Sequence, residues 1–296
     1  MKRTDPRDQP IWLPARGTWQ CRIPSPHAVG ASRVEVLVPD RLGSAGKCRV
    51  LYALPVESSR THRYGDAIKV LRELGAHNRC NLIIVVPSFP IDPWYGNHAT
   101  NPGRRFEDYL VKTLVPWIER RFAVEDAAEG RFLLGFSKSG WGAFTLLLRH
   151  PKVFGYAASW DAPLMMSTKQ FGIWRTGANF GTPATMARHL PSTLLRRKAP
   201  EFRDRPRLVL AGETNFGTSS DPRFPYDGPS HTEAFHALAD ALGVKHRYAP
   251  DLRARHSWNP KWVSPVLDLL MGLPPAGRLA ARRRLAPSRR VHYSVG

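Results

Sequence analysis

Short apolar runs rich in β-branched residues alternate along the chain with segments whose apolar residues recur every three or four positions. The first pattern is typical of buried strands, and the second is typical of helices with one buried face. We therefore expect strands at 33–39, 48–56, 81–86, 131–134, 156–159, 207–211 and 245–249. We expect helices at 65–74, 106–122, 139–150, 232–242 and 263–271.

The alternation of strands and helices predicts the fold class. Parallel strands need long crossover connections, which are usually helices and which cover both faces of the sheet. The sequence therefore predicts an α/β protein with three layers, in which a mostly parallel central sheet lies between two layers of helices. The clearest helix is the one at 106–122, whose apolar residues share one face: Leu110, Leu114, Trp117, Ile118 and Phe122.

The same pattern predicts how the chain is divided. The alternation begins near residue 33, so we expect an N-terminal extension at 1–32 and one α/β domain at 33–273. Between 161 and 205 the pattern weakens, and Gly, Pro, Met and aromatic residues are mixed. We interpret that segment as a small cap inserted over the edge of the sheet. Pro274 and Pro275 open a basic tail, 274–296, which we expect to be disordered.

The net charge limits the possible partners. The 296 residues carry a formal net charge of +20, and the last twenty contain six arginines and no carboxylate, so the rest of the chain carries +14. Such a surface attracts nucleic acid, anionic lipid or acidic substrates. The sequence contains no recognition-helix, zinc-finger or aromatic ribonucleoprotein motif, so we expect no specific nucleic-acid partner.

Other features of the sequence predict the compartment. No run approaches the roughly 20 apolar residues that span a bilayer, and no apolar segment follows the basic residues at the start. Cys21, Cys48 and Cys80 are widely spaced, and they fit neither a disulfide framework nor a zinc motif. We expect a soluble cytoplasmic protein without a membrane span.

The stretch 131–143, RFLLGFSKSGWGA, predicts a catalytic serine. An apolar strand runs into Ser137 and a helical pattern follows, and such a sharp strand-to-helix turn lifts a serine hydroxyl above the sheet. The amide of Lys138 at the start of the helix is placed to donate to a developing oxyanion. Ser139 stands where the motif G-x-S-x-G has its second glycine, and Gly140 follows it.

A serine needs a base, and the base needs an acid that orients it. In an α/β-hydrolase the chain order is serine, acid, histidine, and His256 follows the last expected strand. The loop after the strand at 207–211 offers three carboxylates as the acid: Asp221, Asp227 and Glu213. The sequence does not choose among them, and we favour Asp221, followed by Asp227. His231 and His236 are five residues apart, which does not fit an i, i+4 metal pair, so we expect no metal site.

Several segments in this order resemble the esterases of the esterase D type, which include S-formylglutathione hydrolases and feruloyl esterases. The segments are RVLYALPVE, DPWYGNH, FEDYLVKTLVPWIERRF, GFSKSGWGAF and AFHALADALGVKHRY followed by HSWNPKW, and the resemblance covers about 33–270. It implies an α/β-hydrolase fold and a serine hydrolase acting on a small ester or thioester without a cofactor. The resemblance implies that Ser137 is the nucleophile and His256 the base.

The chain departs from that family at two places. Many relatives have His-Gly where this chain has Pro55-Val56-Glu57, so we expect the second oxyanion donor to be the amide of Val56 or Glu57. Relatives often have an acid where Asn215 stands, so the acid must come from elsewhere in the loop. An acyltransferase with the same serine and a catalytically impaired binding protein are the alternative functions.

Aromatic residues near these motifs are candidates for a substrate pocket. Trp94, Tyr95 and Trp141 are the first candidates, followed by Trp160 and Trp174. Packing in the core or the cap is an equal expectation for each of them.

Overall fold

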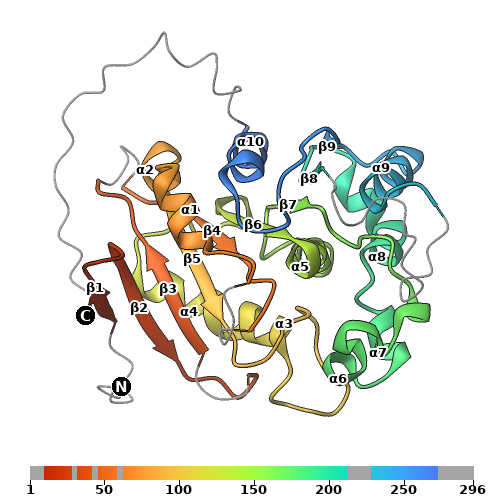
Figure 1. The fold of residues 1–296 in the computed structure, drawn as a ribbon, viewed down its shortest axis with the longest axis horizontal. Coiled ribbons are helices and arrows are strands. Elements are labelled where there is room, and N and C mark those ends of the chain that lie inside the picture. Colours follow the sequence, from red (N-terminus) through yellow and green to blue (C-terminus); the bar gives the residue numbers. More distant parts are fainter. Residues whose placement is uncertain (1–9, 29–31, 42–45, 59–62, 213–227, 273–296) are drawn as a thin grey trace, which may run out of the picture.

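The computed structural model describes residues 10–28, 32–41, 46–58, 63–212 and 228–272. Its centre is a nine-stranded sheet with the strand order β1-β2-β3-β5-β4-β6-β7-β8-β9 (Figure 1). The strands are β1 (Ile11–Leu13), β2 (Thr18–Ile23), β3 (Ser32–Leu37), β4 (Arg49–Ala53), β5 (Leu82–Ser88), β6 (Arg131–Phe136), β7 (Tyr156–Trp160), β8 (Leu208–Ala211) and β9 (His246–Ala249).

The sheet is parallel from β5 to β9 and antiparallel at its other edge. Strands β5, β4, β6, β7, β8 and β9 pair in parallel, so the carboxyl ends of these strands lie along one rim of the sheet. Strands β1, β2 and β3 pair antiparallel, and β3 pairs antiparallel with β5. The expected N-terminal extension at 1–32 therefore contributes two strands to the same sheet.

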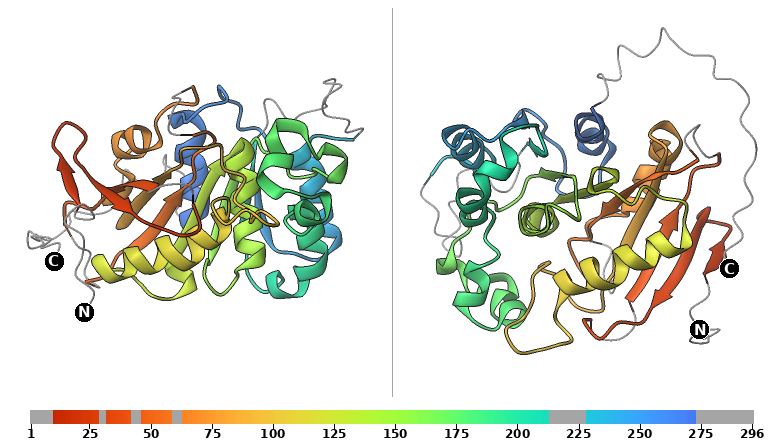
Figure 2. Two further views of the ribbon diagram at one scale, coloured as in Figure 1. Left: turned by 90° about the horizontal axis from the view of Figure 1, so that it is seen from below. Right: turned by 180° about the vertical axis from the view of Figure 1, so that it is seen from behind.

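Helices cover both faces of the sheet (Figure 2). On one face lie α1 (Ala67–Glu73), α2 (Ala76–Arg79) and α10 (Pro260–Met271), and on the other lie α3 (Phe106–Asp108), η2 (Tyr109–Leu114), α4 (Val115–Arg121), α5 (Ser137–Arg149), α8 (Pro191–Lys198) and α9 (His231–Ala241). Adjacent residues of β4 point to opposite faces of the sheet. Leu51 packs with α1 and α10, whereas Val50 and Tyr52 pack with α4 and α5. The expected three-layer arrangement is confirmed.

The helix expected at 106–122 forms as three consecutive segments, α3, η2 and α4, and its apolar stripe is buried as expected. The middle segment is a π-helix, and Pro116 lies at the start of α4. Proline has no backbone N–H and its ring crowds the preceding turn, which accounts for the wider turn at this point.

The segment expected as a cap, 161–205, folds into short helices. They are η4 (Thr168–Gln170), η5 (Ile173–Arg175), α6 (Thr176–Phe180), α7 (Pro183–Ala187), α8 and η6 (Ala199–Phe202); the remaining short helix, η3 (Ala128–Gly130), precedes β6. A third apolar cluster joins this segment to the body, and its buried members are Trp94, Trp141, Met166, Phe180, Met186 and Leu190.

A buried carboxylate also joins the 161–205 segment to the body. Glu107 in α3 accepts hydrogen bonds from Arg149 Nε (2.7 Å), His150 Nε2 (2.5 Å) and His189 Nε2 (2.9 Å). Burial raises the pKa of Glu107, but the hydrogen bonds from both histidines and the charges of His189 and Arg149 outweigh it, so the pKa lies far below its usual value. The network therefore needs an ionised Glu107.

The expected basic tail at 274–296 lies outside the described residues. The three cysteines are buried and free. Among the residues that the structure describes, no helix combines the length and apolar character needed to cross a membrane.

Candidate active site

The expected nucleophile, Ser137, lies at a tight turn between β6 and α5. Its φ is +52°, a left-handed conformation that non-glycine residues rarely adopt. Its backbone N–H donates to the carbonyl oxygen of Asp161 at 3.0 Å. At Gly135 a Cβ atom would lie 2.4 Å from the backbone of Ser139, so only glycine fits there. These features are those expected of a nucleophile at a strained strand-to-helix turn.

The departure from G-x-S-x-G at Ser139 has a structural explanation. The Ser139 hydroxyl accepts a hydrogen bond from the N–H of Phe136 (3.1 Å) and donates one to the carbonyl oxygen of Phe136 (2.8 Å). The position that has no room for a side chain is instead Gly140, where a Cβ atom would lie 2.6 Å from Ser159 Oγ and 2.9 Å from Ala162 Cβ. Serine therefore closes the turn with its side chain, and the following glycine provides the space.

The expected base, His256, is hydrogen-bonded to a carboxylate. Its Nδ1 donates to Asp161 Oδ2 at 2.5 Å, and the side chain of Asp161 is fully buried while that of His256 is 12% exposed. Because an ionised carboxylate only accepts, Nδ1 carries the proton, which leaves Nε2 of a neutral ring with a lone pair. Asp161 directly follows β7 and, like Ser137, has a left-handed backbone, with a φ of +44°.

Three hydrogen bonds hold the loop that carries His256. Trp160 Nε1 donates to the carbonyl oxygen of Leu252 (2.7 Å), and Trp262 Nε1 donates to that of Ser257 (2.8 Å). The N–H of Trp258 donates to the carbonyl oxygen of Tyr64 (2.8 Å). The two indoles also stack on each other, with centroids 5.0 Å apart and planes 5° apart. The loop is therefore fixed on both sides of the imidazole.

Ring contacts place this imidazole at the rim of the sheet beside the nucleophile turn. The His256 ring centroid lies 5.2 Å from that of Phe136, 5.9 Å from Tyr64 and 6.1 Å from Trp160. Phe136 immediately precedes the serine and Trp160 immediately precedes the aspartate. Serine, histidine and aspartate are thus held at the carboxyl ends of two neighbouring strands, β6 and β7.

Sequence reasoning did not find Asp161. It placed the acid in the loop after β8, and Asp221, Asp227 and Glu213 all lie outside the described residues. The available signal was an aspartate directly after the strand that ends in Trp160, which also satisfies the order serine, acid, histidine.

The expected oxyanion donors lie on two anchored segments. Lys138 is the second residue of α5, where a helix leaves N–H groups without partners inside the helix. Among the described residues, neither its amide nor that of Val56 has a hydrogen-bond acceptor. The loop around Val56 is held on both sides, because the Tyr95 hydroxyl donates to the carbonyl oxygen of Pro55 and the N–H of Ser58 donates to Asp92 Oδ1 (3.0 Å).

The aromatic residues expected to line a substrate pocket are buried. Trp94, Tyr95 and Trp141 all have 0% exposed surface. The rings of Trp94 and Trp141 meet edge-on with centroids 5.3 Å apart, inside the cluster that joins the 161–205 segment to the body. Tyr95 fills the space beside Gly142, where a Cβ atom would lie 2.2 Å from its ring. In this conformation the three side chains pack in the core, which is the alternative that the sequence left equally open for each of them.

The side chain of Lys138 lies at the edge of this cluster and is 17% exposed. Its Nζ lies 3.8 Å from Asp92 Oδ2 and 6.0 Å from the centroid of the Trp94 ring. Burial lowers the pKa of Lys138, and the charges of Asp92 and Glu57 oppose that shift. A carboxylate therefore accompanies the lysine that follows Ser137, and Arg175 lies 4.0 Å from the same carboxylate.

A cavity of about 330 Å³ adjoins the site on the side of β3 and β5. Its lining residues include Trp258 of the His256 loop and also Val56, Glu57, Tyr64, Arg16 and Arg33. Among the described residues, the one group of side chains close enough together to hold a metal ion is His236, Asp240 and His246, on α9 and β9.

Comparison with protein families gives a match over most of the chain. The model described as "Putative esterase" matches residues 29–263. "Esterase Rv1288" of Mycobacterium tuberculosis is 25% identical over 275 residues, which cover 85% of this chain. The aligned region spans 58% of that relative's length.

Solved structures share the fold at lower identity. An S-formylglutathione hydrolase of Staphylococcus aureus superposes with a TM-score of 0.63 at 14% identity, covering 86% of this chain and 98% of the other. A fluorophosphonate-binding serine hydrolase of the same species superposes with a TM-score of 0.61 at 15% identity, covering 85% of this chain and 97% of the other. Together with the mostly parallel sheet, these likenesses confirm the expected α/β-hydrolase fold.

Proposed function

The chain belongs to the esterase family whose model it matches, and we propose on that basis that it is a serine hydrolase in which Ser137 is the nucleophile, His256 the base and Asp161 the acid. The observation that carries the proposal is the 2.5 Å hydrogen bond from His256 Nδ1 to Asp161 Oδ2, made beside a left-handed serine at a strand-to-helix turn. Such a bond leaves Nε2 of the ring as the proton acceptor, which is the state that a serine nucleophile requires.

The proposed reaction has two halves. His256 Nε2 takes the proton from Ser137 Oγ as the oxygen attacks the carbonyl carbon of the ester or thioester. The C–O or C–S bond of the tetrahedral intermediate breaks, and the imidazolium returns the proton to the departing alcohol or thiol. Water then attacks the acyl-enzyme with the same proton transfers, which releases the carboxylic acid and restores Ser137.

The amides of Lys138 and Val56 are the proposed donors to the oxyanion. A donor of this kind typically contributes about 3 kcal/mol to the transition state. Both amides are unengaged among the described residues, and the loop that carries Val56 is fixed through Pro55 and Ser58, which supports donors that are placed in advance.

Asp161 is proposed to keep His256 in one orientation and one tautomer and to stabilise the imidazolium as it forms. Its burial supports this role, since a fully buried carboxylate beside a cation interacts more strongly than an exposed one. Asp221 and Asp227 remain candidates from the sequence.

The substrate class is proposed to be a small carboxylic ester or thioester. The family match supports an ester, and one superposed relative is an S-formylglutathione hydrolase, which acts on a thioester. The cavity bordered by Val56, Tyr64 and Trp258 is the space we propose for part of the substrate.

Steady-state hydrolysis of short-chain p-nitrophenyl esters and thioesters tests the proposal. We expect Ser137→Ala and His256→Ala to lower kcat by on the order of 10⁴-fold or more with the fold intact by circular dichroism. Ser159→Ala is the matched control, because Ser159 is a buried serine on the neighbouring strand whose hydroxyl lacks a partner among the described residues. Equal loss in the control, or full activity in Ser137→Ala, contradicts the proposal.

The same assay addresses the two alternatives. Added acceptor alcohols that yield transesterified product faster than free acid identify an acyltransferase with the same serine. A folded wild-type protein that turns over none of the esters and thioesters identifies a binding protein on this fold.

A further inference from the structure

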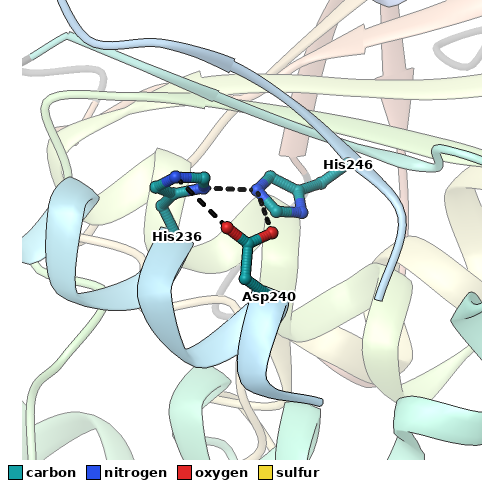
Figure 3. A group of neighbouring side chains, drawn as sticks. All are labelled: His236, Asp240 and His246. Carbon is teal, nitrogen blue, oxygen red and sulfur yellow. Dashed lines mark hydrogen bonds and ion pairs between the residues drawn. The ribbon is translucent and has the colours of Figure 1, made fainter. Parts of the chain in front are cut away.

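Three potential metal ligands, His236, Asp240 and His246, meet where α9 is connected to β9 (Figure 3). His236 and Asp240 are four residues apart on α9, so they lie on one face of the helix. His246 is the first residue of β9, and the chain reverses between the two elements at Gly243, whose φ is +65°. The parallel strands bring Ser137 to the opposite rim of the sheet, because it follows the last residue of β6.

The three side chains lie close together. His236 Nδ1 lies 2.7 Å from His246 Nε2, His236 Nε2 lies 3.4 Å from Asp240 Oδ2, and His246 Nε2 lies 3.9 Å from Asp240 Oδ1. One ligand atom from each residue lies within 4.8 Å of the other two. Two nitrogens bound to one tetrahedral zinc ion at about 2.0–2.1 Å are about 3.3 Å apart. Binding an ion would therefore lengthen the distance from His236 Nδ1 to His246 Nε2, now 2.7 Å, by only about 0.6 Å.

The tautomer of His246 is set for coordination. Its Nδ1 lies 2.9 Å from the carbonyl oxygen of Val244, and because a carbonyl only accepts, Nδ1 is the protonated nitrogen. Nε2 therefore directs its lone pair at His236 and Asp240. A backbone carbonyl that fixes the ring through its other nitrogen is the usual support of a metal-binding histidine.

The surroundings also suit a cation. The chain has twenty more lysines and arginines than aspartates and glutamates. Even so, within the described residues Asp240 forms ion pairs with these two histidines and with no lysine or arginine, so its charge is available to a metal ion. The His236 ring stacks on Tyr248 with centroids 3.9 Å apart, which fixes its orientation. His246 is nearly buried and Asp240 is 62% exposed, so one side of the cluster faces solvent, where water completes a coordination shell.

We propose that His236, Asp240 and His246 form a site for a divalent transition-metal ion of the zinc class, with water as the remaining ligand. Two imidazoles and one carboxylate favour Zn²⁺, Co²⁺ or Ni²⁺ over Mg²⁺ and Ca²⁺, which prefer oxygen ligands. The ion ties the end of α9 to the start of edge strand β9 and stabilises that edge. The site goes beyond the proposed hydrolase and does not depend on it.

Calorimetric titration of the full chain, prepared without a histidine tag, with ZnCl₂ tests the site. We expect one Zn²⁺ per chain, a rise in Tm on binding, and no heat with MgCl₂. Co²⁺ is expected to give visible d–d absorption bands that Zn²⁺ abolishes.

Variants make the test specific. We expect Asp240→Asn and His236→Gln each to weaken Zn²⁺ binding by on the order of 100-fold and to remove the rise in Tm. Glu233→Gln, an exposed acid on the same helix, and His27→Gln, a histidine elsewhere, are the matched controls and keep wild-type binding. Absence of stoichiometric binding, or equal affinity in Asp240→Asn, His236→Gln and the controls, overturns the proposal.

Discussion

The backbone N–H of Ser137 donates a hydrogen bond of 3.0 Å to the carbonyl oxygen of Asp161. The residues before them, Phe136 and Trp160, are register partners on β6 and β7, and both Ser137 and Asp161 then take left-handed backbone conformations. The proposed nucleophile and acid are therefore held by one backbone contact, and the imidazole of His256 is hydrogen-bonded to the side chain of the acid.

The first prediction concerns the acid. Asp161→Asn keeps the size of the side chain but removes the charge that fixes the tautomer of His256, so kcat is expected to fall by on the order of 10⁴-fold. Asp221→Asn and Asp227→Asn are the comparison, and we expect less than about a threefold change in each. If kcat falls strongly in Asp221→Asn or Asp227→Asn while Asp161→Asn stays active, the acid belongs to the loop after β8 and is not Asp161.

The second prediction concerns the nucleophile turn. Ser139→Ala leaves the buried N–H of Phe136 without its acceptor, which costs about 1–3 kcal/mol of unfolding free energy. Gly140→Ala forces a methyl group against Ser159 and Ala162 and is expected to cost about 1–3 kcal/mol through overcrowding. Urea denaturation measures both. Ser159→Ala is the control. If it lowers the unfolding free energy as much as Ser139→Ala does, the hydrogen bonds of the Ser139 hydroxyl are unimportant.

The third prediction concerns Tyr95, which we interpret as a positioning residue. Tyr95→Phe removes the hydrogen bond to Pro55 and loosens the loop that carries Val56. We expect kcat to fall by about tenfold with little change in KM, since one hydrogen bond contributes roughly 0.5–1.5 kcal/mol. Tyr52→Phe is the matched control, because its buried hydroxyl lacks a partner among the described residues. A rise in KM at constant kcat would instead indicate direct contact with substrate.

The fourth prediction concerns acid stability. The pKa of Glu107 is depressed in the folded protein, so its contribution to stability is fully present above its unfolded value of about 4.5 and is lost as the pH falls below that value. Between pH 7 and pH 3 we expect the wild type to lose on the order of 2 kcal/mol more unfolding free energy than Glu107→Gln. Glu233→Gln is the exposed control. Parallel stability curves for wild type and Glu107→Gln would show that the carboxylate is unimportant for acid stability.

Much of the fold was predictable from local pattern. All seven strands and five helices expected from the sequence are present in the structure. Each of them buries an apolar run or stripe except β9, whose four residues are only partly buried. Strands β1 and β2 were not expected, since β1 is largely exposed and β2 mixes polar with apolar residues. Their place in the sheet depends on pairing with β3, which a local pattern does not encode.

The serine turn and the histidine loop were recognisable because each has a short motif. The partner of His256 was not, because it depends on tertiary structure: the loop after β9 returns to the end of β7, where His256 meets Asp161. The burial of Trp94 and Trp141 likewise depends on the folded 161–205 segment. The group formed by His236, Asp240 and His246 combines a helix and a strand, so comparing His236 with His231 in the sequence could not find it.

Covalent labelling with a fluorophosphonate, followed by mass spectrometry of the digested protein, tests directly whether Ser137 is the nucleophile and His256 its base. We predict a single adduct, on the hydroxyl of Ser137, forming at least about 10³-fold more slowly in His256→Ala. An adduct on a different serine, or an unchanged labelling rate in a folded His256→Ala protein, would contradict the account.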